Sequence, residues 1–160
     1  MGRITIRRAT AAEKPEWLRM RLALWPHGTV ETFSTEMDAM LADPLSPVFL
    51  AARSDASASA ALSAGISTSL GGFLEAGTRK YAEGGESSPV GYIEGWYVDA
   101  DLRGQGIGKA LMQAAEDWAR SLGLAEMGSD TWLDNEASIR AHTSLGYEET
   151  ERLVHFVKRL

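Results

Sequence analysis

The alternation of apolar and polar residues divides the N-terminal part of the chain into one strand and two helices. Residues 3–7 alternate with a period of two, which predicts a strand with one buried face. Thr10 and Glu13 have capping-box spacing, and apolar residues follow at helical spacing as far as Pro26, so we expect a helix there. A second helix is expected over residues 34–43.

The next apolar runs, at 48–52 and 72–79, are typical of buried strands. The stretch between them, residues 54–69, is dominated by serine and alanine, which favours a long flexible connection. A four-residue spacing of apolar side chains favours a short helix instead, and both interpretations stay open. These side chains are Leu62, Ile66 and Leu70.

The second half of the chain predicts a strand, a helix and another strand. Residues 90–98 are strand-like, and regular alternation would place four of their side chains on one face. A helix is expected from Gly104 to Leu122 with Gly123 as its stop, followed by a strand over 124–132. The four side chains of the shared face would be Tyr92, Glu94, Trp96 and Val98.

The C-terminal part predicts one more helix and two strands. The pair Asp134-Asn135 is a good helix N-cap, and the helix should end at Leu145, before Gly146. Residues 147–158 then predict two strands. The order of elements indicates an α/β fold with a mixed, mostly antiparallel sheet and helices on both faces.

Composition limits the classes of function. With 160 residues, of which 44% are hydrophobic, the chain is sized for a single domain over residues 1–160. Its net charge of −6 disfavours nucleic acid and favours a cationic partner. Because no apolar run approaches about 20 residues and no signal region is evident, we expect a cytoplasmic protein without membrane association.

The sequence contains no cysteine, which excludes disulfides, thiolate metal ligands and a cysteine nucleophile. We expect no metal site, and we expect any acyl transfer to go directly from donor to acceptor. A serine acyl-enzyme would need a base, and the only imidazoles are those of His27, His142 and His155.

A glycine-rich segment between an expected strand and an expected helix could bind an anion. The first N–H groups of a helix lack intrahelical acceptors, and glycines let a phosphate approach them. The spacing fits neither the P-loop nor the dinucleotide fingerprint. The residues of this anion cradle, with the entering Val98, are Arg103, Gly104, Gln105, Gly106, Ile107, Gly108 and Lys109.

The pattern Arg103-x-x-Gly106-x-Gly108 resembles the acetyl-coenzyme A loop of the GCN5-related N-acetyltransferases. The resemblance implies that fold, with acetyl-CoA held by the cradle and by Asn135 at the pantetheine arm. It also implies that the Val98 N–H stabilises the developing oxyanion. His142 stands where the family often carries a tyrosine that protonates the leaving thiolate, so it is a candidate general acid.

Within that family, several segments look like the aminoglycoside 6′-N-acetyltransferases, among them Trp25-Pro26, Ser129-Asp130-Thr131 and Leu145-Gly146-Tyr147. This implies acetyl transfer from acetyl-CoA to the 6′-amine of an aminoglycoside, and we expect a homodimer. A cationic substrate needs carboxylates, and one of them, Glu94 or Asp130, or a water chain must take the proton of the attacking amine. The candidate substrate-binding residues are Trp25, Tyr81, Glu86, Glu94, Asp130 and Glu136.

Three aromatic side chains, those of Trp25, Tyr81 and Trp96, either stack on sugar rings or fill the core, and we favour the core for Trp96. Two other functions remain open. One is acetylation of a different amine, such as a polyamine, a small metabolite or a protein N-terminus. The other is coenzyme A binding without catalysis.

Overall fold

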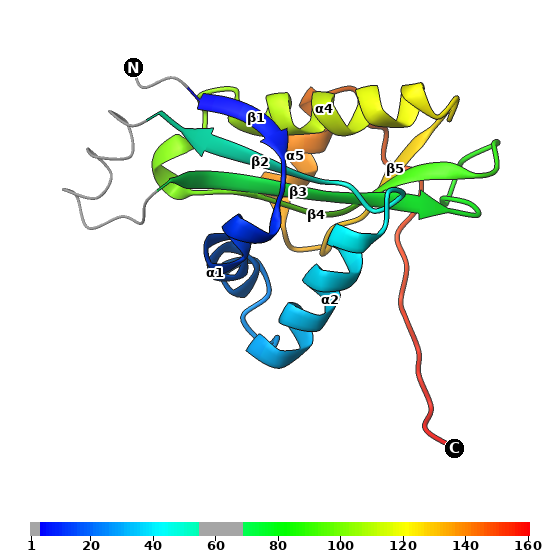
Figure 1. The fold of residues 1–160 in the computed structure, drawn as a ribbon. Coiled ribbons are helices and arrows are strands. Elements are labelled where there is room, and N and C mark those ends of the chain that lie inside the picture. The colour runs from blue at the N-terminus through cyan, green and yellow to red at the C-terminus, as the bar shows by residue number, and fades with distance from the viewer. Residues whose placement is uncertain (1–3, 55–68) are drawn as a thin grey trace.

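The computed structural model describes residues 4–54 and 69–160 (Figure 1). Its centre is a five-stranded sheet in the order β1-β2-β3-β4-β5, in which β1 to β4 are antiparallel and β5 is parallel to β4. The strands are β1 (Ile4–Arg8), β2 (Val48–Arg53), β3 (Leu70–Arg79), β4 (Val90–Val98) and β5 (Met127–Ser129).

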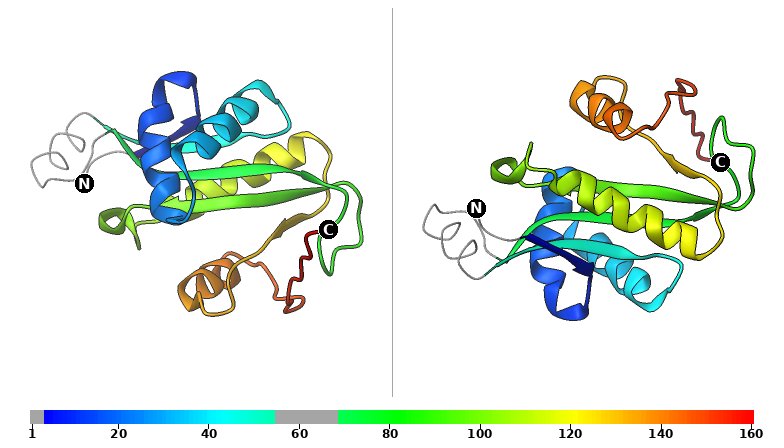
Figure 2. Two further views of the ribbon diagram at one scale, coloured as in Figure 1. Left: turned by 90° about the horizontal axis from the view of Figure 1, so that it is seen from below. Right: turned by 90° about the horizontal axis from the view of Figure 1, so that it is seen from above.

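Helices cover both faces of this sheet, which confirms the predicted fold class. Helices α1 and α2 lie on one face and α4 lies on the other, while α5 lies beside β5 (Figures 1 and 2). The described residues form α1 (Lys14–Leu24), α2 (Val30–Ala42), α4 (Ile107–Ser121) and α5 (Glu136–Ser144), with short 3-10 turns at Ala11–Glu13 and Ala100–Leu102. None of the helices in residues 4–54 and 69–160 is long and apolar enough to cross a membrane.

Two apolar clusters hold the layers together. Trp17 and Met20 of α1 pack with Phe73 of β3 on one face, and Leu111 and Met112 of α4 pack on the other. All five side chains are almost completely buried. Each such burial stabilises the fold by about 1.5–3 kcal/mol, so the sheet is fixed between its helices.

Side-chain caps set the helix starts. The Glu13 carboxylate accepts from the Thr10 N–H and hydroxyl, both at 2.7 Å, as the capping box predicts. Helix α2 begins at Val30 and not at Ser34, because the Thr29 hydroxyl caps it by accepting from the Thr32 N–H at 3.2 Å. The predicted start of this helix is therefore wrong.

A β-bulge interrupts the alternation in β4. Ile93 and Gly95 pair with consecutive residues of β3, so Glu94 between them is an extra residue. Trp96 and Val98 consequently pack on the same face as Ile93, against the cluster of α4. The prediction that four alternate side chains of this strand share one face is wrong for that reason.

Three further boundaries differ from the predictions. Helix α4 begins at Ile107 rather than Gly104, and β5 spans three residues rather than nine. No strand forms over residues 147–158, and the described sheet ends at β5. Leu70 belongs to β3 and is fully buried, whereas Leu62 and Ile66 lie outside the described residues.

Candidate active site

Buried ion pairs hold the chain where it leaves β4 and enters the cradle. The Asp99 carboxylate is buried and accepts two hydrogen bonds from Arg19, both at 3.0 Å, and one from Arg53 at 3.3 Å. Arg53 also donates to the Asp101 carboxylate at 2.8 Å, and its hydrogen bonding to Asp101 lowers the pKa of that carboxyl. No local sequence pattern predicts this cluster, since Arg19 and Asp99 are 80 residues apart.

The cradle glycines differ in what they allow. Gly104 and Gly106 have φ of +73° and +80°, and a Cβ on either would meet no protein atom within 4 Å. A Cβ on Gly108 would instead lie 2.8 Å from Cζ2 of Trp96. The first two glycines therefore turn the chain and leave open space in front of the α4 N-terminus, whereas Gly108 allows close packing on β4.

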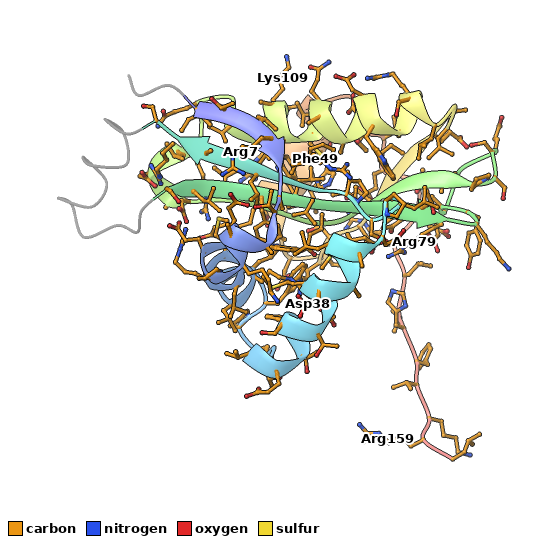
Figure 3. All side chains as sticks on the ribbon, in the orientation of Figure 1. Arg7, Asp38, Phe49, Arg79, Lys109 and Arg159 are labelled. Atoms are coloured by element: carbon orange, nitrogen blue, oxygen red, sulfur yellow. The ribbon has the colours of Figure 1, made fainter. Side chains whose placement is uncertain are left out.

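The donors around this open space suit an anion. The first turn of α4 presents backbone N–H groups that have no intrahelical acceptor, and the helix dipole adds partial positive charge. The Gln105 side chain donates to the Asp101 carbonyl at 2.7 Å, and this bond stabilises the turn before α4. Lys109 is exposed on the outer side of α4 (Figure 3). The cradle thus has the open volume and the donors that a pyrophosphate requires.

Strands β4 and β5 separate beyond the point where they pair. Their pairing covers only residues 91–93 of β4. The Asp99 N–H donates toward β3, to the Gly71 carbonyl at 2.8 Å. Successive residues of a strand point their backbone N–H and C=O groups to opposite sides, so the N–H and C=O of Val98 point away from β3. On that side the Val98 carbonyl accepts a hydrogen bond from Arg103 Nε at 2.9 Å. The open edge of β4 therefore offers backbone groups to an extended ligand.

An unpaired donor lies beside this open edge. The Trp96 indole Nε1 is buried and has no acceptor within the described residues. The ring packs edge-on against His142 of α5, with 5.2 Å between centroids, and against the second apolar cluster. Trp96 therefore fills core, as we favoured, and its N–H is an orphaned donor next to the cradle.

His142 is held from both ring nitrogens. Its Nδ1 lies 2.8 Å from the Ser138 carbonyl, which can only accept, so Nδ1 carries the proton. The Nε2 atom lies 2.8 Å from the Ser129 hydroxyl and accepts from it. The neutral imidazole therefore has no free N–H for a thiolate, and any proton would have to come from the imidazolium, whose Nε2–H faces the Ser129 hydroxyl.

The structure links two of the predicted carboxylates through Arg79 and Tyr92. Arg79 of β3 donates to Glu94 through Nε at 2.9 Å and through Nη2 at 2.6 Å. Its guanidinium carbon also lies 3.5 Å from the centroid of the Tyr92 ring. The Tyr92 hydroxyl in turn donates to Asp130 at 2.7 Å, just after β5. Burial and this bond raise the pKa of Tyr92, so it stays a donor.

Four further candidates lie in three separate parts of the chain. Tyr81 and Glu86 lie exposed in the loop between β3 and β4. Trp25 packs against Phe33 and Phe73 beside the first apolar cluster and is only partly buried. Glu136 pairs with Arg140 of its own helix at 3.1 Å, and this ion pair is exposed.

The last candidate, Asn135, caps α5, because its side-chain oxygen accepts from the Ser138 N–H at 3.1 Å. Glu126 was not among the predicted site residues. Its carboxylate accepts from the Glu86 N–H at 3.0 Å and from Ser87, which fixes the loop of Tyr81 and Glu86 to the start of β5.

Comparison with known proteins identifies this arrangement. The family model described as "Acetyltransferase (GNAT) family" matches residues 15–147. The chain belongs to this family. Its five-stranded mixed sheet is the GNAT fold, and the open edge of β4 beside the cradle lies in the part of the chain that the family model covers.

Similarity to individual GNAT proteins extends over nearly the whole chain. The aminoglycoside N(6′)-acetyltransferase type 1 of Stenotrophomonas maltophilia is 39% identical over 153 residues, which cover 95% of this chain and 91% of that protein. The structure of AAC(6′)-Iy in complex with the bisubstrate analogue CoA-S-monomethyl-acetylneamine has a TM-score of 0.85 at 30% identity and 99% coverage of both chains. The apo AAC(6′)-IG of Acinetobacter haemolyticus has a TM-score of 0.84 at 35% identity, with 98% and 99% coverage.

Proposed function

We infer that this chain is an aminoglycoside 6′-N-acetyltransferase, an enzyme that transfers the acetyl group of acetyl-CoA directly to the 6′-amine of its substrate. The observation that carries the inference is the similarity, over nearly its full length, to aminoglycoside N(6′)-acetyltransferases. The activity is that of an antibiotic-resistance enzyme. We place one catalytic domain over residues 1–160, and we place it in the cytoplasm, where acetyl-CoA is made and used.

The cradle and the open edge of β4 would hold acetyl-CoA. The pyrophosphate would accept from the backbone of residues 104–109, with Arg103 and Lys109 adding positive charge. The pantetheine arm would extend along β4 beside Asn135. When bound, the cofactor supplies an activated thioester, and the residues of this chain bind and orient it.

Val98 is the proposed oxyanion donor. Its N–H points to the side of β4 that β5 leaves open, as the hydrogen bond of its carbonyl to Arg103 indicates. A backbone donor held in a sheet does not reorganise as negative charge develops on the thioester oxygen.

The amine would be bound and deprotonated at the carboxylates. Asp130 is exposed and keeps one carboxylate oxygen free of the Tyr92 bond, so it can accept the proton of the attacking ammonium directly or through water. Glu94 would neutralise a second ammonium group, and Tyr81, Glu86 and Glu136 would extend the acidic and aromatic rim. Trp25 would support Glu94, because it packs against Gly95.

His142 would assist the leaving thiolate without being essential to it. A thiol has a pKa of about 8.5, so its thiolate leaves readily in a site rich in N–H donors. In the imidazolium form, Nε2–H of His142 would donate its proton to the Ser129 hydroxyl oxygen, and that hydroxyl would pass its own proton to the sulfur.

We also propose that the enzyme is a homodimer that exchanges its C-terminal segments. The Thr150 hydroxyl donates to the Glu83 carbonyl at 3.0 Å, and beyond it residues 151–160 extend away from the sheet (Figures 1 and 3). This segment exposes Phe156 and Val157 by 92% and 95%. The β5 edge of a second copy would offer both the hydrogen bonds and the apolar cover that these residues need.

The proposed activity is tested by release of coenzyme A thiol with an aminoglycoside, a polyamine and a peptide N-terminus as acceptors. We expect turnover with the aminoglycoside and little with the others. The Asp130→Asn enzyme should lose about a hundredfold in kcat/KM and keep its affinity for acetyl-CoA. Preferred turnover of the polyamine or peptide would indicate another amine as substrate, and no thiol release with any amine would leave only coenzyme A binding.

A further inference from the structure

We propose that Arg79 is an internal counter-ion that occupies an ammonium subsite beside Glu94 and Asp130, and that a polycationic acceptor displaces it on binding. The inference rests on the proposed function of these carboxylates. It assigns to Arg79 control of how tightly acceptors bind, and thereby a preference for substrates with several ammonium groups.

The contacts of Arg79 match those that a bound ammonium group would make. Its guanidinium bridges the Glu94 carboxylate with two charge-assisted hydrogen bonds and covers the face of Tyr92. Asp130, which accepts a hydrogen bond from the Tyr92 hydroxyl, is close enough to attract the guanidinium electrostatically as well. A carboxylate pair and an aromatic face are the groups that bind an aminosugar, and here a cation of the protein itself uses them.

The exposure of this ion pair separates it from the fixed pairs of the fold. Arg79 and Glu94 keep 42% and 38% of their side-chain surfaces exposed, whereas the values for Arg53 and Asp99 are 2% and 7%. Exposed pairs stabilise by about 0–1 kcal/mol, so a ligand cation can replace one at small cost. Arg79 is the last residue of β3, at the end of the sheet from which the C-terminal segment leaves (Figure 3), and its side chain can move into solvent without disturbing the core.

Displacement has a consequence for acceptor choice. A ligand with one ammonium group replaces only some of the hydrogen bonds and cation–π contact that Glu94 and Tyr92 lose when Arg79 leaves. A ligand with several ammonium groups satisfies Glu94 and Asp130 together. The arginine therefore lowers the affinity for every cationic acceptor, and lowers it most for simple amines.

Three variants test this inference. Arg79→Gln removes the charge, Arg79→Lys keeps the charge without the planar fork, and Arg120→Gln is a matched control. Arg120 is exposed on α4, is paired with Glu116 and Asp117, and loses the same charge when it is replaced. The measurements are KM and kcat for kanamycin, Kd for kanamycin by calorimetry in the presence of coenzyme A, and Kd for acetyl-CoA.

We expect Arg79→Gln to lower the KM and Kd for kanamycin about three- to tenfold, the loss of one weak competing ion pair. Arg79→Lys and Arg120→Gln should stay within about twofold of wild type, and acetyl-CoA affinity should be unchanged in all three. A higher KM or a large loss of kcat in Arg79→Gln, or no change in any constant, would overturn the inference. Absence of aminoglycoside turnover in the wild type would instead overturn the proposed function itself, and the inference with it.

Discussion

At the scale of single residues, the most unusual group is the buried carboxylate of Glu75. It accepts from the Trp17 indole at 2.8 Å and lies 3.0 Å from Arg21 Nε. Burial raises its pKa to about 7, against the opposing effects of Arg21 and Trp17. Glu75 of β3 lies opposite Gly95 of β4, directly beside the Glu94 bulge. It therefore belongs to the part of the sheet that positions Glu94.

This pKa predicts how stability depends on pH. The folded carboxyl holds its proton up to about pH 7, and the unfolded one loses it near 4.5, so folding takes up a proton in that window. The contribution of Glu75 to stability is therefore largest below pH 4.5, falls as pH rises to about 7, and is then constant. The expected fall is about 1.4 kcal/mol per pH unit within the window.

Urea unfolding at pH 5 and pH 7.5 measures this effect in the wild type and in Glu75→Gln. Because the amide does not titrate, the stability of the variant should fall less between the two pH values than that of the wild type. An equal change with pH in both proteins would show that Glu75 does not hold a proton in the fold.

At the scale of elements, helix α4 carries two left-handed glycines with different tasks. Gly106 precedes the helix with φ of +80° and Gly123 follows it with φ of +74°, and neither has a protein atom within 4 Å of a built Cβ. Gly106 faces the space assigned to the cofactor, and Gly123 ends the helix. Both positions require a positive φ, but only Gly106 lies beside the space assigned to the cofactor.

Alanine at either position should cost the fold about 1–2 kcal/mol, since both demand a left-handed residue. Only Gly106→Ala should also weaken acetyl-CoA binding, by tenfold or more, because its methyl group would stand between the pyrophosphate and the backbone. Thermal unfolding and calorimetry separate the two effects. Equal acetyl-CoA affinity in folded Gly106→Ala and Gly123→Ala would refute the placement of the cofactor.

Local signals explain which elements the sequence could predict. The Thr10 capping box, the stops at Gly123 and Gly146 and the apolar run of β2 act within a few residues, and the structure has each of them. The bulge at Glu94 has no such signal, because neither neighbouring composition nor spacing marks an extra residue.

The predicted site contains a part that is local in sequence and a part that depends on contacts between distant residues. The cradle is contiguous in sequence, so its glycine pattern could be recognised by its resemblance to the acetyl-coenzyme A loop of the family. The link from Glu94 to Asp130 depends on Arg79 and Tyr92, and the cluster around Asp99 depends on arginines of α1 and β2. Such contacts arise from strand order and register, which a single sequence does not specify.

At the scale of the whole molecule, the C-terminal segment is notable because it exposes apolar side chains that a sheet would normally bury. Its apolar pattern predicted strands, and in the isolated chain Leu153, Val154, Phe156 and Val157 are exposed instead. A strand with apolar residues on both faces is stable only between other elements. The failed prediction and the proposed segment exchange therefore have one physical cause.

Sedimentation of charge-matched variants tests the exchange. Replacing both Phe156 and Val157 by aspartate should convert the dimer to monomer and lower solubility little. Lys158→Asp changes the net charge by the same amount and should remain a dimer. A monomeric wild type, or a dimer that both variants keep, would contradict the proposed exchange.

We expect the enzyme to acetylate one defined amine, the 6′-amine. The most direct test compares two aminoglycosides that differ only in carrying an amine or a hydroxyl at the 6′ position. Each is incubated with acetyl-CoA and the enzyme, thiol release is measured, and the product is located by NMR. We predict rapid thiol release and a single acetyl group on the 6′-nitrogen of the amine compound, with at least a hundredfold slower release for its hydroxyl partner. Equal rates for the two compounds, or an acetyl group on a different nitrogen, would contradict this prediction.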